Sequence, residues 1–181
     1  MGHREQLMAG AKRCLEERGY ARTTSRDIAA AANNAPVGTI NYHYGSKEAL
    51  LNAALLEIVH EWGDRVSRGA ERADERYWRR VAAPEAADRP VLVAALEAQA
   101  EAERTPEIRQ QIAEAYAKAR TTLSAELYGV DDPDEARAVG SVHMALTAGL
   151  TQQWLIDPDS APSGADVVRA LRALADHLAD G

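Results

Sequence analysis

The fold of this chain is decided by the stretch from Gly19 to Leu51, which reads GYARTTSRDIAAAANNAPVGTINYHYGSKEALL. Thr24 and Ser25 are of the residue types that favour helix N-caps, so a short helix is expected to begin there. The run Asn33-Asn34-Ala35-Pro36 then interrupts the helical pattern, because asparagine tolerates the left-handed conformation and proline suits the first turn of a new helix. A second short helix is therefore expected from Val37 to about His43.

Longer helices are expected on both sides of this stretch. Apolar residues at helical spacing from Leu7 to Leu15 predict a helix over Arg4 to Arg18, with Gly19 as its stop. Ser46 is expected to cap a long helix whose apolar face runs from Leu51 to Val66. Three helices near the N-terminus, of which the second and third are short and joined by a tight turn, have the layout of a helix-turn-helix.

The rest of the chain also predicts helices. Amphipathic patterns begin near Val91, Pro106, Asp132 and Val167, whereas weaker periodicity between Gly69 and Pro90 predicts an irregular or shorter helical connection. Ala, Leu, Glu and Arg dominate the composition and phenylalanine is absent, which favours helices over strands. We therefore expect an all-α protein.

Charge is distributed unevenly along the 181 residues, whose formal net charge is −7. Residues 1–47 carry seven basic and four acidic side chains, so the remainder carries the negative charge. A mildly basic head on an acidic body is compatible with a head that faces a polyanion. Cys14 is the single cysteine, which excludes an internal disulfide and a thiolate zinc site. With no apolar run long enough for a signal peptide or membrane span, we expect a cytoplasmic protein.

The predicted third helix has the chemistry of a major-groove reader. Its polar and aromatic side chains supply donors, acceptors and rings, while Val37 and Ile40 are left to anchor it. A short core helix would not need so much polar chemistry.

Three segments of the head resemble the N-terminal signature of the TetR family of bacterial transcriptional regulators. They are Gly19–Thr24, Arg26–Ala29 and Gly38–Leu51. Weaker similarity to the penultimate helix of many members lies in Leu146–Leu150 and Gln153–Pro158. The resemblance implies an all-α homodimer with a helix-turn-helix domain at residues 1–47 and a helical effector-binding and dimerisation domain at residues 48–181.

The resemblance also implies which residues meet double-stranded DNA. Thr24 and Arg26 would touch phosphates, Thr39, Asn41 and His43 would face base edges, and Tyr42, Tyr44 and Lys47 would lie at phosphates. The complete expected set is Thr24, Ser25, Arg26, Val37, Gly38, Thr39, Asn41, Tyr42, His43, Tyr44 and Lys47. The stretch from Ile28 to Lys47 is about one residue longer than the usual spacing, so we expect a lengthened turn in which one asparagine takes the backbone role of a glycine.

Two further sets of residues are candidates in the body of the chain. A cavity for an unidentified small-molecule effector could be lined by Trp62, Tyr77, Trp78, Tyr116, His143 and Met144. For any one of these residues, an ordinary core or surface role is the more common alternative. The apolar seams of the last two helices could form an intramolecular core or a dimer interface, and the resemblance favours the interface. Those residues are Leu146, Leu150, Trp154, Leu171, Leu174 and Leu178.

Two other classes of function are alternatives to a DNA-binding regulator. An enzyme is disfavoured, because the sequence holds no Ser-His-Asp order, no glycine-rich phosphate loop and no His-Glu metal cluster, so neither a cofactor nor a metal is expected. A helical protein-protein interaction module without DNA readout is the stronger alternative. We expect a homodimeric transcriptional regulator, a repressor in most members of such a family, that an effector releases from a near-palindromic operator.

Overall fold

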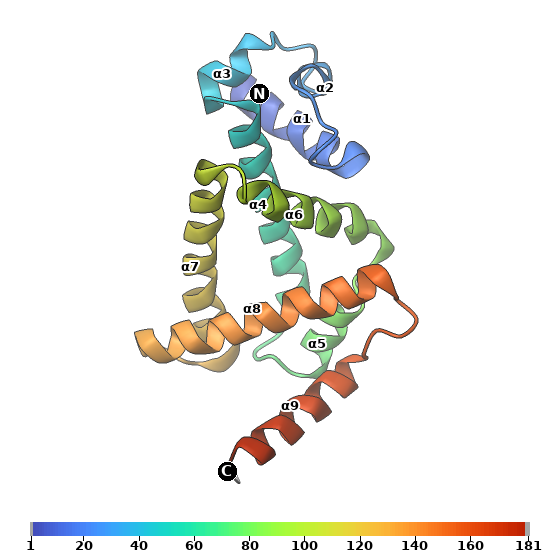
Figure 1. The fold of residues 1–181 in the computed structure, drawn as a ribbon, viewed down its shortest axis with the longest axis vertical. Coiled ribbons are helices and arrows are strands. Elements are labelled where there is room, and N and C mark those ends of the chain that lie inside the picture. The colour runs from blue at the N-terminus through green and yellow to red at the C-terminus, as the bar shows by residue number, and fades with distance from the viewer. Residues whose placement is uncertain (1, 180–181) are drawn as a thin grey trace. The chain divides into compact units, whose positions relative to one another are not determined.

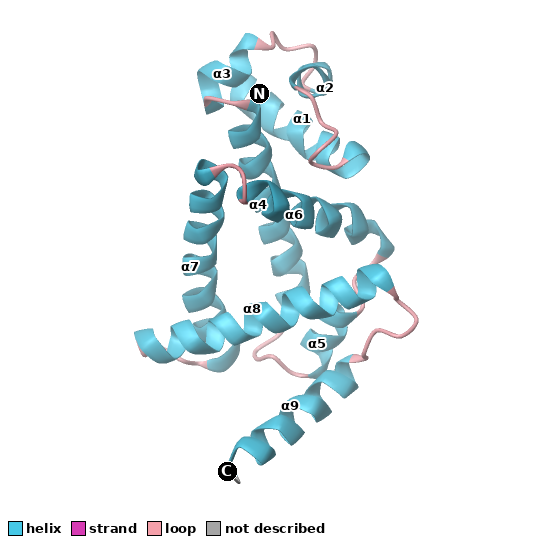
Figure 2. Ribbon diagram, viewed as in Figure 1, coloured by secondary structure: helices cyan, strands magenta, loops and turns pink. Residues whose placement is uncertain are grey.

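The computed structural model describes residues 2–179, and every regular element within that range is helical (Figure 2). The helices labelled in Figure 1 are α1 His3–Arg18, α2 Ser25–Ala31, α3 Gly38–Tyr44, α4 Lys47–Ser67, α5 Glu75–Ala82, α6 Arg89–Ala102, α7 Pro106–Tyr128, α8 Pro133–Ile156 and α9 Gly164–Ala179. A short 3-10 helix covers Ala86–Asp88. The expected all-α fold is confirmed, and the connection between α4 and α6 contains the short helix α5 and the 3-10 helix.

The helix boundaries lie at residues whose types favour helix caps and helix stops. Gly19 ends α1 with a φ of 79°, and Gly129 follows the end of α7 with a φ of 65°. Ser46 caps α4 by accepting a hydrogen bond from the Ala49 backbone N–H at 3.0 Å. Asp132 caps α8 in the same way, accepting from the Glu135 backbone N–H at 2.9 Å. None of the helices between residues 2 and 179 has both the length and the apolar character that a bilayer crossing requires.

The chain packs as two compact units. Within the described residues, one consists of residues 2–63 and Ala87–Ala115, and the other of Asp64–Ala86 and residues 116–179. The first unit is larger than the expected DNA-binding domain of residues 1–47, because α4 and α6 supply much of its core. The functional boundary between residues 47 and 48 stays a prediction.

The first unit is built around α1 and the N-terminal half of α4. Leu7, Leu15, Leu50 and Leu51 are fully buried, and Ala94 of α6 joins them. The helix α2 lies so close to α1 that a Cβ at Gly10 would be 2.9 Å from the Ile28 carbonyl oxygen, so this position of α1 admits only glycine without a shift.

The second unit also depends on close backbone approaches. A Cβ at Gly140 of α8 would be 2.2 Å from the Arg120 carbonyl oxygen of α7, and one at Gly164 of α9 would be 2.5 Å from the Arg79 backbone nitrogen of α5. The first half of α9 packs on α5 through Val167, which is buried, whereas every side chain from residue 172 to residue 179 is exposed.

Candidate nucleic-acid interface

A reciprocal cap between Thr24 and Asp27 closes the start of α2. The Thr24 hydroxyl donates to Asp27 Oδ2 at 2.6 Å and accepts from the Asp27 backbone N–H at 3.2 Å. Hydrogen bonds from the side chain and then the backbone of Thr24 hold the pKa of the Asp27 carboxyl below its usual range. Thr24 is therefore the N-cap, and Ser25 and the exposed Arg26 follow it in the first turn.

The turn between α2 and α3 is built on two left-handed residues. Asn33 and Asn34 both have a φ of 57°, so two asparagines, rather than the single one expected, take the conformation that glycine adopts most easily. The backbone N–H of Ala35 donates to the Ala29 carbonyl at 3.1 Å and closes the turn onto α2.

The third helix presents polar groups and one large ring to solvent. Asn41 is exposed. Tyr42 is 84% exposed, and its ring packs edge to face against the His43 ring, with the two centroids 4.9 Å apart. Thr39 is half-buried, and its hydroxyl donates to the Pro36 carbonyl at 2.5 Å, which leaves its oxygen free to accept. Donors, acceptors and a ring thus line the outer side of a helix that is two turns long.

A single apolar side chain anchors that helix. Ile40 is 1% exposed and belongs to the core around α1, whereas Val37 is 45% exposed. The expectation that both residues anchor the helix is therefore wrong for Val37. Val37 is the N-cap of α3 and stands outside its packed side, and the neighbouring Gly38 is exposed as well.

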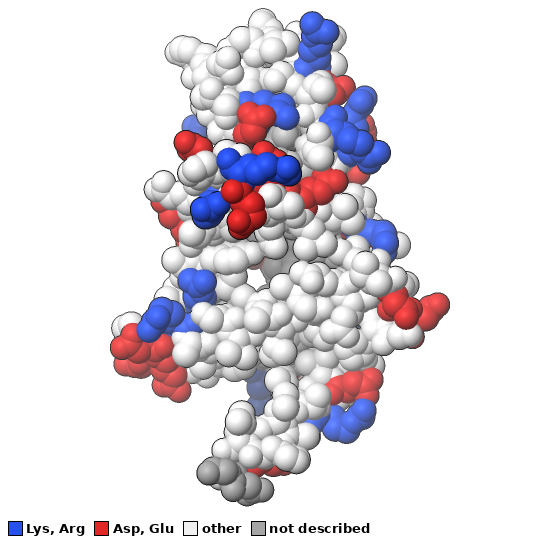
Figure 3. Space-filling model, in the orientation of Figure 1, with Lys and Arg blue, Asp and Glu red and all other residues white. Residues whose placement is uncertain are grey.

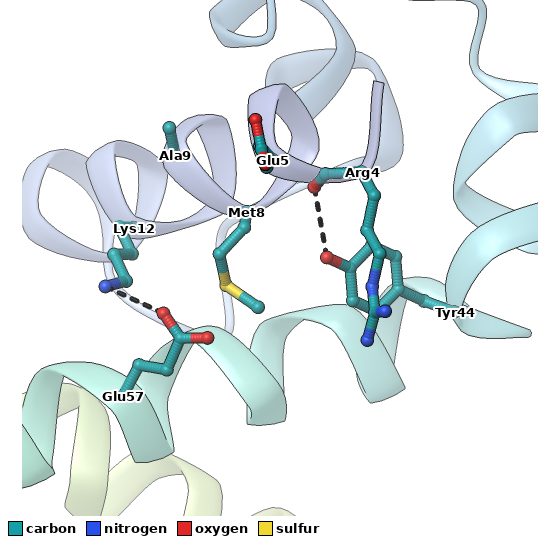
Figure 4. A pocket seen from close by; sticks show the side chains of 7 residues that line it. All are labelled: Arg4, Glu5, Met8, Ala9, Lys12, Tyr44 and Glu57. Carbon is teal, nitrogen blue, oxygen red and sulfur yellow. Dashed lines mark hydrogen bonds and ion pairs between the residues drawn. The ribbon is translucent and has the colours of Figure 1, made fainter. Parts of the chain in front are cut away.

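Tyr44 and Lys47 are bound to the head itself. The Tyr44 hydroxyl donates to the Arg4 carbonyl at 3.1 Å, which joins the end of α3 to the start of α1 (Figure 4). Lys47 Nζ donates to the Thr23 carbonyl at 3.1 Å and lies 3.3 Å from Glu48 Oε1. Both side chains therefore brace the helix-turn-helix, whatever contacts they make with a ligand.

Charges on the head are partly paired. Lys12 Nζ of α1 lies 2.9 Å from Glu57 and 2.7 Å from Glu61 of α4, and Arg18 lies 3.1 Å from Asp27. Figure 3 shows basic and acidic side chains interleaved over α1 and α2, while the part of that face formed by α3 is uncharged. The third helix is therefore equipped to read hydrogen-bonding groups rather than charge.

In the second unit, a buried imidazole holds three helices together. His143 of α8 is 2% exposed; its Nε2 lies 2.7 Å from the Tyr77 hydroxyl of α5, and its Nδ1 lies 2.9 Å from the Tyr128 hydroxyl of α7. Trp78 packs against the imidazole, with ring centroids 5.2 Å apart. Burial lowers the pKa of His143 to about 4, so the ring is neutral at pH 7 and uses one nitrogen as donor and the other as acceptor.

The expected effector residues are only partly brought together. Tyr77, Trp78 and His143 form this cluster, and Tyr128 and Thr147, whose hydroxyl is 3.5 Å from His143 Nε2, complete it. Tyr116 and Met144 are half-buried elsewhere in the same unit, and Trp62 is buried in the other unit. Among residues 2–179, no group of three or more His, Cys, Asp or Glu side chains is arranged to hold a metal ion.

Two family models match the chain. The model described as bacterial regulatory proteins, tetR family, matches residues 7–54, and the model of the tetracyclin repressor-like C-terminal domain matches residues 75–177. Together they account for most of the chain. This protein belongs to the TetR family. The resemblance of the N-terminal motifs is thereby confirmed: residues 7–54, from α1 into the start of α4, match the helix-turn-helix region of TetR-family transcriptional regulators.

Proteins of known sequence or structure are similar to this chain, in sequence over the head and in fold over most of its length. The HTH-type transcriptional regulator TtgR of Pseudomonas putida is 40% identical over 72 residues, which are 40% of this chain and only 33% of that relative. The crystal structure of a transcriptional regulator from Pseudomonas aeruginosa has a TM-score of 0.68 at 24% identity and covers 98% of this chain and 90% of its own. The multidrug-binding protein EbrR, solved with proflavin, has a TM-score of 0.67 at 24% identity over 96% and 99% of the two chains.

The expected interface residues of this TetR-family chain fall into two groups. Leu150 is buried, and Leu146, Trp154 and Leu171 are half-buried. Leu174 and Leu178, by contrast, are 59% and 83% exposed on α9. The two exposed leucines lie four residues apart and therefore on one side of the helix.

Sequence reasoning missed two features that organise the site. Tyr128 closes the His143 cluster, and the only signal was an aromatic residue directly before the helix stop at Gly129. Glu97 of α6 accepts the backbone N–H groups of Tyr20 at 2.6 Å and Ala21 at 3.1 Å, which holds the turn after α1. No local pattern indicates that contact, because its partners are more than seventy residues apart.

Proposed function

We propose that this protein is a homodimeric transcriptional repressor that binds a near-palindromic operator and is released from it by a small molecule. The observation that carries the proposal is the outer side of α3, where Asn41, Tyr42 and Thr39 are presented on a helix whose one buried anchor is Ile40. A helix of this kind fits the major groove, where donors and acceptors distinguish all four base pairs.

The dimer is supported by the exposed leucines of α9. Leu174 and Leu178 continue the seam that begins at the half-buried Leu171, so an apolar stripe on the last helix is left uncovered by its own chain. A second copy would cover it through an isologous interface, in which the same patch of both subunits meets. Two copies would carry two recognition helices whose centres are ~34 Å apart for half-sites one turn apart.

Selection of duplexes from random DNA tests the central part of the proposal. We expect a two-fold symmetric consensus, because two identical heads read identical half-sites. Asn41→Ala should relax the preference at one position in each half-site, whereas Gln110→Ala, a change of an exposed amide on α7, should leave the consensus unchanged. An asymmetric consensus, or none, would favour a helical protein-protein interaction module without DNA readout.

Sedimentation equilibrium tests the dimer. Leu174→Glu combined with Leu178→Glu should shift the protein to monomer and weaken operator binding together, because two charges would be buried without partners. Arg172→Glu adds a glutamate to the same helix on another side and should leave the dimer intact. A dimer that survives the double leucine change would place the interface elsewhere.

The effector part rests on the cluster around His143. Helical regulatory domains bind small molecules between facing helices with mostly apolar walls and a few polar groups, and Tyr77, Trp78 and His143 combine such chemistry on α5 and α8. EbrR, which shares the fold, binds proflavin. By analogy, we propose that the present chain also binds a small-molecule effector. The protein would regulate transcription in the cytoplasm, and we expect it to have no catalytic activity.

A thermal-shift screen finds the effector, because a ligand that binds only the native state raises the melting temperature. A compound that is an effector should raise the melting temperature and weaken operator binding in the same concentration range. Tyr77→Phe, which removes the hydroxyl that meets His143, should change the affinity for that compound and leave DNA binding without the compound unchanged. A compound that stabilises the protein without weakening operator binding is not the effector.

A further inference from the structure

The start of α1 is tied to the end of the recognition helix by a single residue pair. The Tyr44 hydroxyl donates to the Arg4 carbonyl at 3.1 Å, and the guanidinium carbon of Arg4 lies 5.7 Å from the centroid of the Tyr44 ring. Figure 4 shows both contacts, with the Arg4 side chain beside the ring rather than extended into solvent. A cation within ~6 Å of an aromatic ring is attracted to its face, so the guanidinium has a preferred place next to α3.

The Arg4 guanidinium has no carboxylate partner within the described part of the chain. Lys12, Arg18 and Lys47 each have a carboxylate within 3.3 Å, but Arg4 has none among residues 2–179. Its neighbour Glu5 accepts the Gly2 backbone N–H at 3.1 Å and caps the helix start instead. Arg4 is exposed and lines a surface hollow of about 460 Å³, whose other charged lining residues are Glu5, Lys12 and Glu57. Lys12 is paired with Glu57, and Glu5 caps the start of α1, so Arg4 is left without an ion-pair partner in this hollow.

An unneutralised guanidinium held beside a DNA-reading helix has one obvious partner. We propose that Arg4 binds a phosphate of the DNA backbone next to the recognition helix, and that Tyr44 is the positioning residue that holds Arg4 there. The planar guanidinium can donate two hydrogen bonds to one phosphate, and stacking on a ring limits the conformations that it must give up. This inference rests on the proposed function, because it adds a contact to the same DNA complex.

The experiment measures how DNA affinity depends on salt. Fluorescence anisotropy with a mixed-sequence DNA duplex gives the slope of log affinity against log salt concentration, which changes by about 0.9 for each phosphate that a side chain neutralises. A dimer contributes two copies of Arg4, so Arg4→Ala should reduce the slope by about 1.8 for a duplex that engages both heads. Arg4→Lys keeps the charge and should retain the slope, with weaker binding because the planar stacking is lost.

Arg13→Ala is the matched control. Arg13 is also an exposed arginine of α1 without a carboxylate partner within residues 2–179, and it lies nine residues from Arg4, on the opposite side of the helix. Its removal takes the same charge from the same helix and should leave the slope unchanged. Tyr44→Phe removes the hydrogen bond to the Arg4 carbonyl and should weaken binding while keeping the slope, because a neutral hydroxyl releases no counterion.

The outcomes distinguish failure of the proposed DNA-binding function from failure of the proposed Arg4 phosphate contact. If the wild-type protein binds no duplex even at low salt, the proposed function fails and this inference fails with it. Wild-type binding with an unchanged slope for Arg4→Ala overturns the inference alone. An equal loss of slope for Arg13→Ala also overturns it, because the effect would then come from the overall charge of the head. Melting temperatures of all four variants show that each is folded.

Discussion

At the scale of single residues, the fold contains buried polar side chains that are stable only because they are hydrogen-bonded. His143 is the clearest example, since a neutral imidazole is buried between two tyrosine hydroxyls. Its pKa of about 4 lies below the ordinary value of 6.5 because burial disfavours the charged ring. Below pH 6.5 the His143 imidazole is protonated in the unfolded chain, whereas in the folded chain it stays neutral down to about pH 4.

Stability should therefore fall as the pH is lowered from about 6.5 to about 4. The depressed pKa corresponds to a loss of up to about 3 kcal/mol over that window, and stability above pH 6.5 should not depend on this group. Urea unfolding at a series of pH values measures the effect. His143→Gln should unfold with a smaller pH dependence than the wild type between pH 6.5 and 4, and equal pH dependences would mean that folding does not lower the pKa of His143.

The left-handed turn residues make a second prediction at this scale. Asn34 has a φ of 57° and an exposed side chain, so its replacement acts on backbone conformation rather than packing. Asn34→Ala should destabilise the head by about 1 kcal/mol, and Asn34→Gly should be neutral or stabilising. In thermal unfolding, Asn34→Ala should have a lower melting temperature than Asn34→Gly. The reverse order would contradict a left-handed backbone at Asn34.

At the scale of helices, close approach decides which substitutions are tolerated. Gly10 of α1 lies against the α2 backbone, whereas Gly63 of α4 has nothing within 4 Å of the position of a Cβ. Gly10→Ala should destabilise the first unit by about 1 to 3 kcal/mol through overpacking. Gly63→Ala should instead stabilise the protein by about 0.5 to 1 kcal/mol, since alanine is the better helix former. If both substitutions stabilise the protein, α1 and α2 do not approach as closely as Gly10 indicates.

The contact between α6 and the turn after α1 makes a prediction of its own. Glu97→Ala would leave the backbone N–H groups of Tyr20 and Ala21 without their acceptor, and should cost about 1 to 3 kcal/mol of stability. Glu103→Ala, which changes an exposed glutamate just after the same helix, should be close to neutral. Equal stability of the two variants would show that the carboxylate is dispensable.

Helices and caps could be predicted from the sequence because their causes are local. Thr24, Ser46 and Asp132 cap the helices that follow them, and Gly19 and Gly129 end the helices that precede them, as their residue types indicate. Long-range pairs could not be predicted. Nothing near Tyr44 or Lys47 in the sequence indicates that their side chains bind the carbonyls of Arg4 and Thr23, because those partners become neighbours only when α1, α3 and α4 pack.

At the scale of the whole molecule, the charge distribution distinguishes the N-terminal head, which is proposed to bind DNA, from the rest of the chain. Residues 1–47 are net basic, and the rest of a chain with an overall charge of −7 is acidic. An acidic body should confine contact with DNA to the heads, so that affinity for non-specific DNA depends on a few side chains of the first unit. The family shows what kind of protein this is, and the exposed groups of α3 indicate how it would read a sequence.

The most direct test of that reading is the change in base preference caused by Asn41→Ala. Binding to the selected operator and to its single-base variants should be measured by fluorescence anisotropy at one salt concentration. We expect the variant to lose about 1 to 3 kcal/mol of discrimination between bases at one symmetric pair of positions and to keep the wild-type preference elsewhere. An unchanged preference at every position would contradict the claim that α3 reads the bases.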